Sequence, residues 1–287
     1  MIEFNEDLLL DYGLWRFKND GISRGTLRKD STGINCFLSY YYNKRIPTGI
    51  GKADRLIQFY RGMQRWYKKL GIGNKTYQRR ALVDIMLYAM LDHLPGDSDT
   101  ENVIRALLLF AKQTAFRSHN CVYTARGGFA RIEHIRFNFL TKGNPNACII
   151  ELPYAKTKQK YDPGKETRTL HCRCSTVGIK KCAVHALYLI CKDRLKMKKQ
   201  ALFLLPNGFP VTYNIYRQIL KVLCDAVGID HHYYTPHALR IGEATDRSMR
   251  GDSIESIMKF VQWKTRESAM IYIRPNNVDF VKFQIIT

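Results

Sequence analysis

The chain has 287 residues, of which 45% are hydrophobic and 12% aromatic, a composition that supports one large core or two modest ones and argues against wholesale disorder. Its formal net charge is +21, from 46 Lys and Arg against 25 Asp and Glu, and such an excess favours an anionic partner. We expect that partner to be nucleic acid rather than an anionic membrane surface, and no run approaches the roughly 18 apolar residues of a membrane-spanning helix.

The eight cysteines and the N-terminal sequence indicate a reducing compartment. In a chain of this length without a signal-peptide pattern, the cysteines are expected to be reduced thiols or metal ligands and not a disulfide framework. We therefore expect an intracellular protein, located in the nucleus if the host is a eukaryote and otherwise in the cytoplasm or nucleoid.

Residues 1–72 have the apolar spacing of helices and are expected to form a helical domain. A predicted helix at about residues 52–70 has a broad apolar face and an opposite face that carries five basic residues. These charges fit contact with phosphate groups as well as they fit a solvated surface. The basic residues are Arg55, Arg61, Arg65, Lys68 and Lys69.

A second domain is predicted to begin after the glycine-rich linker at residues 71–75 and to cover residues 75–287. Its first helix is expected over residues 77–94, where Pro95 and Gly96 stop it. The apolar residues of the C-terminal tail, 276–287, fit docking on a neighbouring protomer as well as on the tail's own domain.

The next predicted helix, residues 101–116, is nearly all apolar and therefore buried, with Asp99 or Thr100 as its cap. Arg117 follows this helix directly. A charge in that position is costly unless it is used or paired, although the side chain could also extend to solvent.

Residues 129–171 change to the alternating pattern of β-strands, with three strands expected near residues 129–140, 147–155 and 166–172. The turn between the second and third strands carries Lys156, Lys158 and Lys160, and such a basic hairpin is either solvated or reaches into a DNA groove. The rest of the chain is predicted to be helical. The fold class is therefore mainly α with a small antiparallel sheet (α+β).

The stretch at residues 235–275 holds four side chains that suit phosphate chemistry. His237 and Arg240 are three residues apart on one side of a predicted helix, and both can hold phosphate oxygens. Trp263 offers an uncharged N–H donor, and the phenol of Tyr272 can act as a nucleophile. Each residue is ordinary when taken singly.

With Arg117 upstream and a lysine on the hairpin, the order Arg, Lys, His-x-x-Arg, Trp, Tyr resembles the tyrosine recombinase (phage-type integrase) family. The gaps of 23 residues from Arg240 to Trp263 and nine from Trp263 to Tyr272 match the family pattern. The resemblance implies that residues 75–275 form the catalytic domain and residues 1–72 a helical core-binding domain that clamps DNA.

The resemblance also implies the chemistry. Tyr272 would attack a DNA backbone phosphate, giving a 3′-phosphotyrosyl link and a free 5′-hydroxyl. Arg117 and Arg240 would stabilise the charge on the phosphate, and His237 and Trp263 would hydrogen-bond its oxygens.

Lys156, with Lys158 in reserve, would protonate the leaving 5′-oxygen as the general acid. Neither a metal nor ATP would be needed for this cleavage and rejoining. The implied partner is double-stranded DNA, bound by a homodimer on each site and a tetramer in the synaptic complex.

Three positions depart from the family pattern. Asn120 stands where the third residue after Arg117 is often acidic, and Ala115 and Gln262 stand where glycine is usual. Arg126 is a poorer alternative to Arg117, because it lies in a turn sequence.

A second cluster of residues could hold a structural zinc ion: Cys172, Cys174, Cys182 and His185, with His171 as an alternate ligand. The alternative is that the thiols belong to a strand and to the core. Similar Cys and His residues occur in some recombinases of the Crypton-like and DIRS-like mobile-element branches.

Two other functions use the same fold. One is a type IB topoisomerase or telomere resolvase, which shares the chemistry of the tyrosine recombinases. The other is a regulatory DNA-binding protein that has lost catalysis. A supercoil-relaxation assay distinguishes the first, and a covalent-adduct assay the second.

Overall fold

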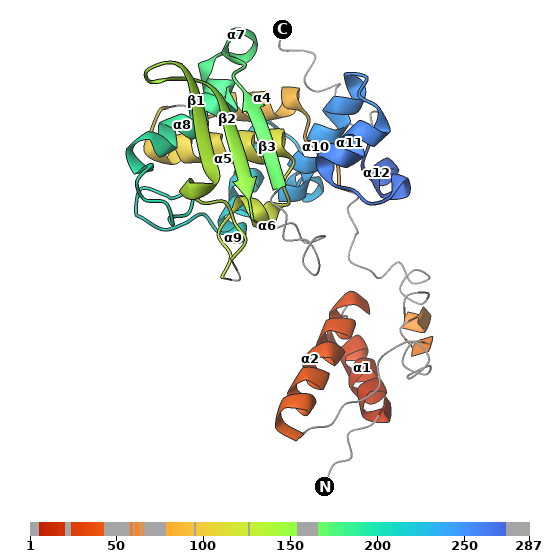
Figure 1. Ribbon diagram of the computed structural model, residues 1–287. Coiled ribbons are helices and arrows are strands. Elements are labelled where there is room, and N and C mark those ends of the chain that lie inside the picture. Colours follow the sequence, from red (N-terminus) through yellow and green to blue (C-terminus); the bar gives the residue numbers. More distant parts are fainter. Residues whose placement is uncertain are drawn as a thin grey trace. The chain divides into compact units, whose positions relative to one another are not determined.

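A computed structural model describes residues 6–20, 24–42, 58–59, 61–63, 65, 79–94, 96–125, 127–153 and 166–273. The chain divides into two compact units, Met1–Tyr77 and Gln78–Thr287 (Figure 1). The predicted linker at residues 71–75 and the tail at 276–287 lie outside the described residues. So do seven of the singled-out basic residues: Arg55, Lys68, Lys69, Arg126, Lys156, Lys158 and Lys160.

The first unit contains two long helices, α1 (Glu6–Asp20) and α2 (Arg24–Tyr42). Leu9, Leu27, Leu38 and Met63 form its buried core. Gly13 permits close packing, because a Cβ there would lie 2.8 Å from a ring carbon of Phe59. The helical character predicted for this part of the chain is confirmed in both helices.

The predicted basic face of the first unit is described at two positions, Arg61 and Arg65. Both are helical and exposed, whereas Met63 between them is buried. At these positions the charged face therefore points away from the core and is accessible to a partner.

Helix α5 (Asp99–Thr114) is the centre of the second unit, with ten buried residues. It packs against α8 (Ala183–Cys191) and α10 (Pro236–Met249). The predicted cap at Asp99 or Thr100 is wrong. The cap is Ser98, whose hydroxyl accepts a bond from the Glu101 N–H while the Glu101 carboxylate accepts one from the Ser98 N–H.

Helix α4 (Asp84–Asp92) begins later than the predicted residue 77, because the segment before it is extended and bonded to α10. The Leu82 N–H donates to the Ala238 carbonyl at 3.0 Å. A Cβ at Gly242 would lie 1.8 Å from the Leu82 oxygen, so only glycine allows this approach. Gly242 therefore lets α10 pack directly against the backbone of the segment before α4.

The three strands β1 (Ile135–Thr141), β2 (Asn144–Leu152) and β3 (Glu166–His171) form one antiparallel sheet in the order β1-β2-β3. The first strand starts later than predicted, because residues 132–134 form a 3-10 turn. Helix α8 contacts β2 and β3, and α5 contacts β3. The α+β fold class is confirmed.

Five further α-helices are described in the second unit. They are α6 (Ser118–Cys121), α7 (Cys174–Val177), α9 (Tyr213–Ala226), α11 (Ile254–Val261) and α12 (Arg266–Tyr272). Figure 1 places α10, α11 and α12 together beside the sheet and α5. Among the described residues, none of the helices is long and apolar enough to cross a membrane.

Two non-glycine residues in the described ranges have a positive φ: Ala115, at 50°, and Gln262, at 57°. Each adopts the left-handed conformation directly after a helix, Ala115 after α5 and Gln262 after α11. These are the two positions where the family pattern has glycine. The departures in sequence therefore change the residue but keep the turn that glycine would favour.

We expect Gln262→Gly to raise the free energy of unfolding by about 0.5–1 kcal/mol. Relief of the left-handed conformation outweighs the extra entropy of glycine in the unfolded chain. The replacement also removes a buried Oε1 that has no hydrogen-bond partner in the described part of the chain. Chemical denaturation measures the change. His93→Gly is the control, because His93 ends α4 with a φ of −82°; equal losses in both variants would contradict strain at Gln262.

Candidate active site

Arg240 joins the C-terminal ends of two helices. It lies on α10 and is only 3% exposed. One guanidinium nitrogen donates to the Ala115 carbonyl at 2.5 Å, and the other terminal nitrogen donates to the Val261 carbonyl. These carbonyls end α5 and α11, so the cation meets the negative ends of both helix dipoles.

Arg168, on strand β3, connects the same two helices. Its Nε donates to the Thr114 carbonyl at 3.2 Å, and its Nη2 donates to the Phe260 carbonyl and to Glu166 Oε1 at 2.9 Å. Two buried arginines thus hold the last turns of α5 and α11 together. The sequence analysis did not single out Arg168, although strand alternation places it on the same inward face as Glu166 and Leu170.

Arg117 lies close to Arg240 because α5 ends in a tight left-handed turn at Ala115. Arg117 is partly buried and precedes the first residue of α6. Burial and the nearby positive charge of Arg117 lower the pKa of Arg240 to about 10.

Tyr272 lies between two other predicted site residues. Its ring stacks on that of Trp263, with centroids 5.3 Å apart and planes at 20°. The His237 ring meets it edge-on, with centroids 5.3 Å apart and planes at 78°. The last residue of α12 is therefore held beside the first turn of α10, which carries His237.

Positive charge is concentrated around His237. Burial and the positive charges of Arg240, Arg79 and Arg117 together lower its pKa to about 4, with burial the largest cause. The sequence analysis missed Arg79, because its position beside α10 depends on the extended segment before α4. A partly buried group of guanidiniums around a neutral imidazole is suited to bind an anion.

The structure brings five predicted catalytic residues into this region: Arg117, His237, Arg240, Trp263 and Tyr272. The predicted general acids Lys156 and Lys158 lie outside the described residues. The strands that flank them do reach the site. Leu152 of β2 pairs with Glu166 of β3, and the Glu166 carboxylate acts electrostatically on Arg240.

A buried ion cluster fixes α10 to α4 and α5. Lys112 is fully buried, and its Nζ lies 2.7 Å from Asp84, 3.1 Å from Glu243 and 2.5 Å from Asp246. The three carboxylates have the proximity of metal ligands, but the ammonium already occupies the place of a cation. Sequence analysis missed this cluster, and the lone lysine inside an apolar helix was the signal that could have indicated it.

The four predicted zinc ligands form a separate group near the start of α8: Cys172, Cys174, Cys182 and His185. The alternate ligand His171 is exposed and does not belong to this group.

We expect the stability contributed by His237 to depend on pH. The folded state lowers its pKa from 6.5 to about 4, so the unfolded chain binds more protons between these values. The contribution is fully present above pH 6.5 and is lost as the pH falls toward 4. The stability difference between wild type and His237→Gln should change by on the order of 1–3 kcal/mol over this window. Thermal or urea denaturation measures this difference, with His93→Gln at an exposed position as the control. A stability difference between wild type and His237→Gln that does not change with pH would contradict the buried, neutral state.

Solved structures share this arrangement of elements. The XerH site-specific recombinase in a post-cleavage complex with palindromic difH substrate aligns with a TM-score of 0.53 at 14% identity, over 94% of this chain and 69% of that chain. The pre-cleavage complex of XerH with difH aligns with a TM-score of 0.50 at 14% identity, over 92% and 71%. The Tn1549 transposon integrase in complex with circular intermediate DNA aligns with a TM-score of 0.50 at 15% identity, over 99% and 86%.

The chain has the tyrosine recombinase fold. No protein-family model and no curated protein matches the sequence. At 14–15% identity, the likeness to tyrosine recombinases extends to the arrangement of helices and strands. The Crypton-like or DIRS-like branch stays a prediction.

Proposed function

We propose that the chain is a site-specific DNA recombinase or integrase that cleaves and rejoins DNA through a covalent link to Tyr272. The observation that supports this most is the position of the Tyr272 ring, packed between His237 and Trp263. Arg117 and Arg240 act electrostatically on the same His237. A phenol nucleophile and an anion-binding cluster therefore occupy one region.

In the proposed reaction, the Tyr272 oxygen forms a bond to the scissile phosphorus while the bond from phosphorus to the 5′-oxygen breaks. The phenol releases its proton to water, and the 5′-oxygen takes one from Lys156 or Lys158. Rejoining is the reverse reaction, so the phosphodiester energy is kept in the phosphotyrosine.

The cationic side chains have different parts in this proposal. Arg117 and Arg240 stabilise the additional negative charge on the transferring phosphate, where fixed donors are most effective. His237, with its pKa of about 4, is neutral at pH 7 and supplies a hydrogen bond but no charge. The indole N–H of Trp263 is a further neutral donor.

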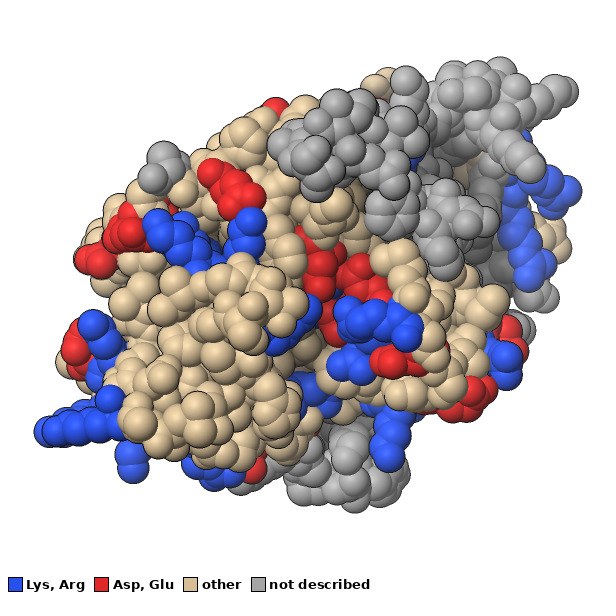
Figure 2. Space-filling view, turned by 90° about the horizontal axis from the view of Figure 1, so that it is seen from above, with Lys and Arg blue, Asp and Glu red and all other residues tan. Residues whose placement is uncertain are grey.

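DNA binding is proposed for both units, because Lys and Arg outnumber Asp and Glu in each. Figure 2 shows one face of the molecule, where Lys and Arg side chains form several separate groups with acidic side chains between them. On this face the basic residues are spread over the surface. In the first unit, the exposed Arg61 and Arg65 are proposed to contact backbone phosphates, together with Arg55, Lys68 and Lys69.

The proposed partner is double-stranded DNA, bound by a homodimer on each site and by a tetramer during strand exchange. The proposed location is inside the cell, where the DNA is.

Covalent capture on a DNA library tests the proposed function. Duplexes with a randomised segment and 5′-bridging phosphorothiolate linkages trap the covalent intermediate, because the released thiolate religates poorly. We expect SDS-resistant adducts whose DNA shares a consensus sequence. Adducts without a consensus, together with relaxation of plasmid of any sequence, would indicate a topoisomerase. Absence of adducts despite DNA binding would indicate a binding protein.

The same library tests the general acid. A thiolate leaving group needs no proton, so Lys156→Ala should cleave the phosphorothiolate DNA normally but ordinary DNA slowly. If Lys158→Ala shows this pattern and Lys156→Ala does not, the general acid is Lys158.

We expect DNA affinity to fall steeply with salt. A protein that neutralises several phosphates releases their counterions, so the dissociation constant should rise by about 10³-fold or more between about 50 and 200 mM salt. Fluorescence anisotropy with a labelled duplex measures this. Affinity that is constant across the range would contradict binding through phosphate contacts.

A further inference from the structure

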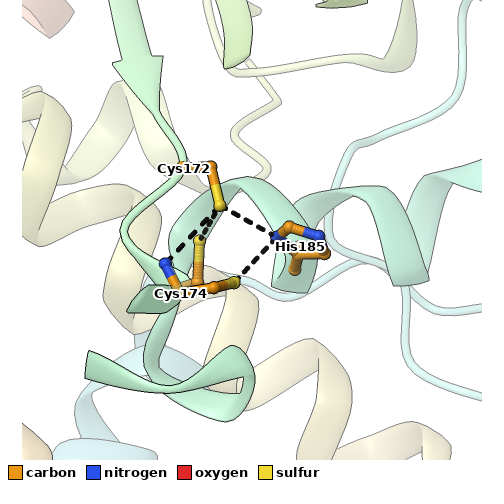
Figure 3. A group of neighbouring side chains, drawn as sticks. Cys172, Cys174 and His185 are labelled. Carbon is orange, nitrogen blue, oxygen red and sulfur yellow. Dashed lines mark hydrogen bonds between the residues drawn. The ribbon is translucent and has the colours of Figure 1, made fainter. Parts of the chain in front are cut away.

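We propose that Cys172, Cys174, Cys182 and His185 bind one structural zinc ion that ties the end of β3 to the start of α8. The four side chains come from a short stretch of chain that folds back on itself. Cys172 follows β3 directly, Cys174 opens α7, and His185 lies in the first turn of α8 (Figure 3). Cys182 is the residue before α8.

The distances between these side chains fit a tetrahedral ion. Cys174 Sγ lies 3.1 Å and Cys172 Sγ 3.7 Å from His185 Nδ1, and the sulfurs of Cys172 and Cys182 are 3.9 Å apart. Zinc with bonds of about 2.3 Å to sulfur and about 2.0–2.1 Å to nitrogen holds its sulfurs about 3.8 Å apart and sulfur and nitrogen about 3.6 Å apart. One ligand atom from each residue lies within 4.8 Å of every other.

Neighbouring groups already contact three of the ligands. His185 Nε2 lies 3.1 Å from Asn144 Oδ1, so Nε2 carries the proton and Nδ1 is left to face the sulfurs. Backbone N–H groups donate to the sulfurs: that of Arg173 to Cys182 and that of Cys174 to Cys172. Such donors stabilise thiolates, the form in which cysteine binds a metal.

The chemistry of the cluster selects zinc and a structural role. Three sulfurs and one imidazole make a soft ligand set, which disfavours magnesium or calcium. Four protein ligands fill a tetrahedron and leave no open position for substrate, so the ion would be structural. The sulfurs of Cys172 and Cys182, 3.9 Å apart, are not bonded as a disulfide.

The position of the cluster gives the ion a consequence for the fold. β3 begins with Glu166 and carries Arg168, which pairs with Glu166 and donates to the ends of α5 and α11, and the strand ends beside Cys172. Helix α8 packs against α5, the centre of the core. A zinc ion would therefore fix the far end of the strand that carries Arg168.

The test uses the full chain, purified without chelators, and needs no DNA, so its outcome is independent of the proposed recombinase function. We expect one zinc per chain by elemental analysis, and X-ray absorption with three sulfurs at about 2.3 Å and one nitrogen at about 2.0–2.1 Å. Removal with a strong chelator should lower the melting temperature, and added Zn²⁺ should restore it.

Matched serine variants assign the ligands. Cys182→Ser should lose the zinc, whereas Cys191→Ser should keep it, because Cys191 is equally buried at the other end of α8 but lies outside the cluster. If Cys182→Ser does not fold, His185→Gln replaces it, and the wild-type chain loaded with Co²⁺ should show the absorption of a tetrahedral thiolate site.

Several results would overturn the proposal. One is a chain that contains no zinc as purified and gains neither metal nor stability when Zn²⁺ is added. Another is zinc content that is unchanged in Cys182→Ser and His185→Gln. A disulfide between two of the three cysteines in the protein purified under reducing conditions would also overturn it.

Discussion

Replacing Arg240 by lysine is expected to slow DNA cleavage by about 10²- to 10³-fold, the typical cost of removing one fixed donor to a developing charge. The planar guanidinium donates to the Ala115 and Val261 carbonyls from two nitrogens. An ammonium keeps the charge but cannot reproduce this fork and also face a phosphate. DNA binding should stay close to wild type, because the other phosphate contacts remain.

Single-turnover cleavage of a captured site, at saturating protein, measures the loss. Arg217→Lys is the control, because Arg217 is exposed on α9 and has no part in the proposed site. Cleavage by Arg240→Lys at the wild-type rate would contradict the assigned role. If DNA binding falls by the same factor as cleavage, Arg240 contributes to DNA binding alone.

Replacing Lys112 by methionine is expected to destabilise the second unit by about 3–5 kcal/mol, the usual cost of removing one partner from a buried ion cluster. Methionine has a similar length, so the packing is largely kept. The loss comes from Asp84, Glu243 and Asp246, which would be left together without the cation that neutralises them.

Chemical denaturation measures the free energy of unfolding of Lys112→Met. Lys221→Met is the control, because Lys221 is exposed on α9. Adding Asp246→Asn to Lys112→Met should recover part of the stability, because one uncompensated charge is removed. If Lys112→Met and Lys221→Met are equally stable, the cluster does not hold α10 in place.

The C-terminal part of the site could be predicted from sequence because it is local. His237 and Arg240 share one helix, and Trp263 and Tyr272 follow at short spacing, so one stretch of chain contains most of the pattern. The cysteine and histidine group is local in the same way. Arg117 was found by its position after a buried helix.

The residues that sequence analysis missed have partners far along the chain. Arg168 donates to Phe260, 92 residues away, and Lys112 to Asp246, 134 residues away. No periodicity within one helix or strand indicates such a pair. The same reason explains the late start of α4, since the bond from Leu82 to Ala238 of α10 belongs to an extended segment that precedes α4.

The backbone conformation of the two residues that replace glycine could not be predicted from the sequence. From the sequence, Ala115 and Gln262 weakened the match to the family pattern. Both residues adopt the left-handed turn at the helix ends that Arg240 joins. The site therefore keeps its geometry, although the left-handed conformation strains the backbone at both residues. The residue types alone do not indicate this conformation.

Identification of the residue that carries the DNA tests the central claim most directly. Covalent adducts from the phosphorothiolate library, digested with nuclease and protease, are analysed by mass spectrometry beside the products of Tyr272→Phe. We expect the nucleotide remnant on Tyr272 in the wild-type chain and no adduct in the variant. A remnant on another residue, or adducts that persist in Tyr272→Phe, would contradict the account.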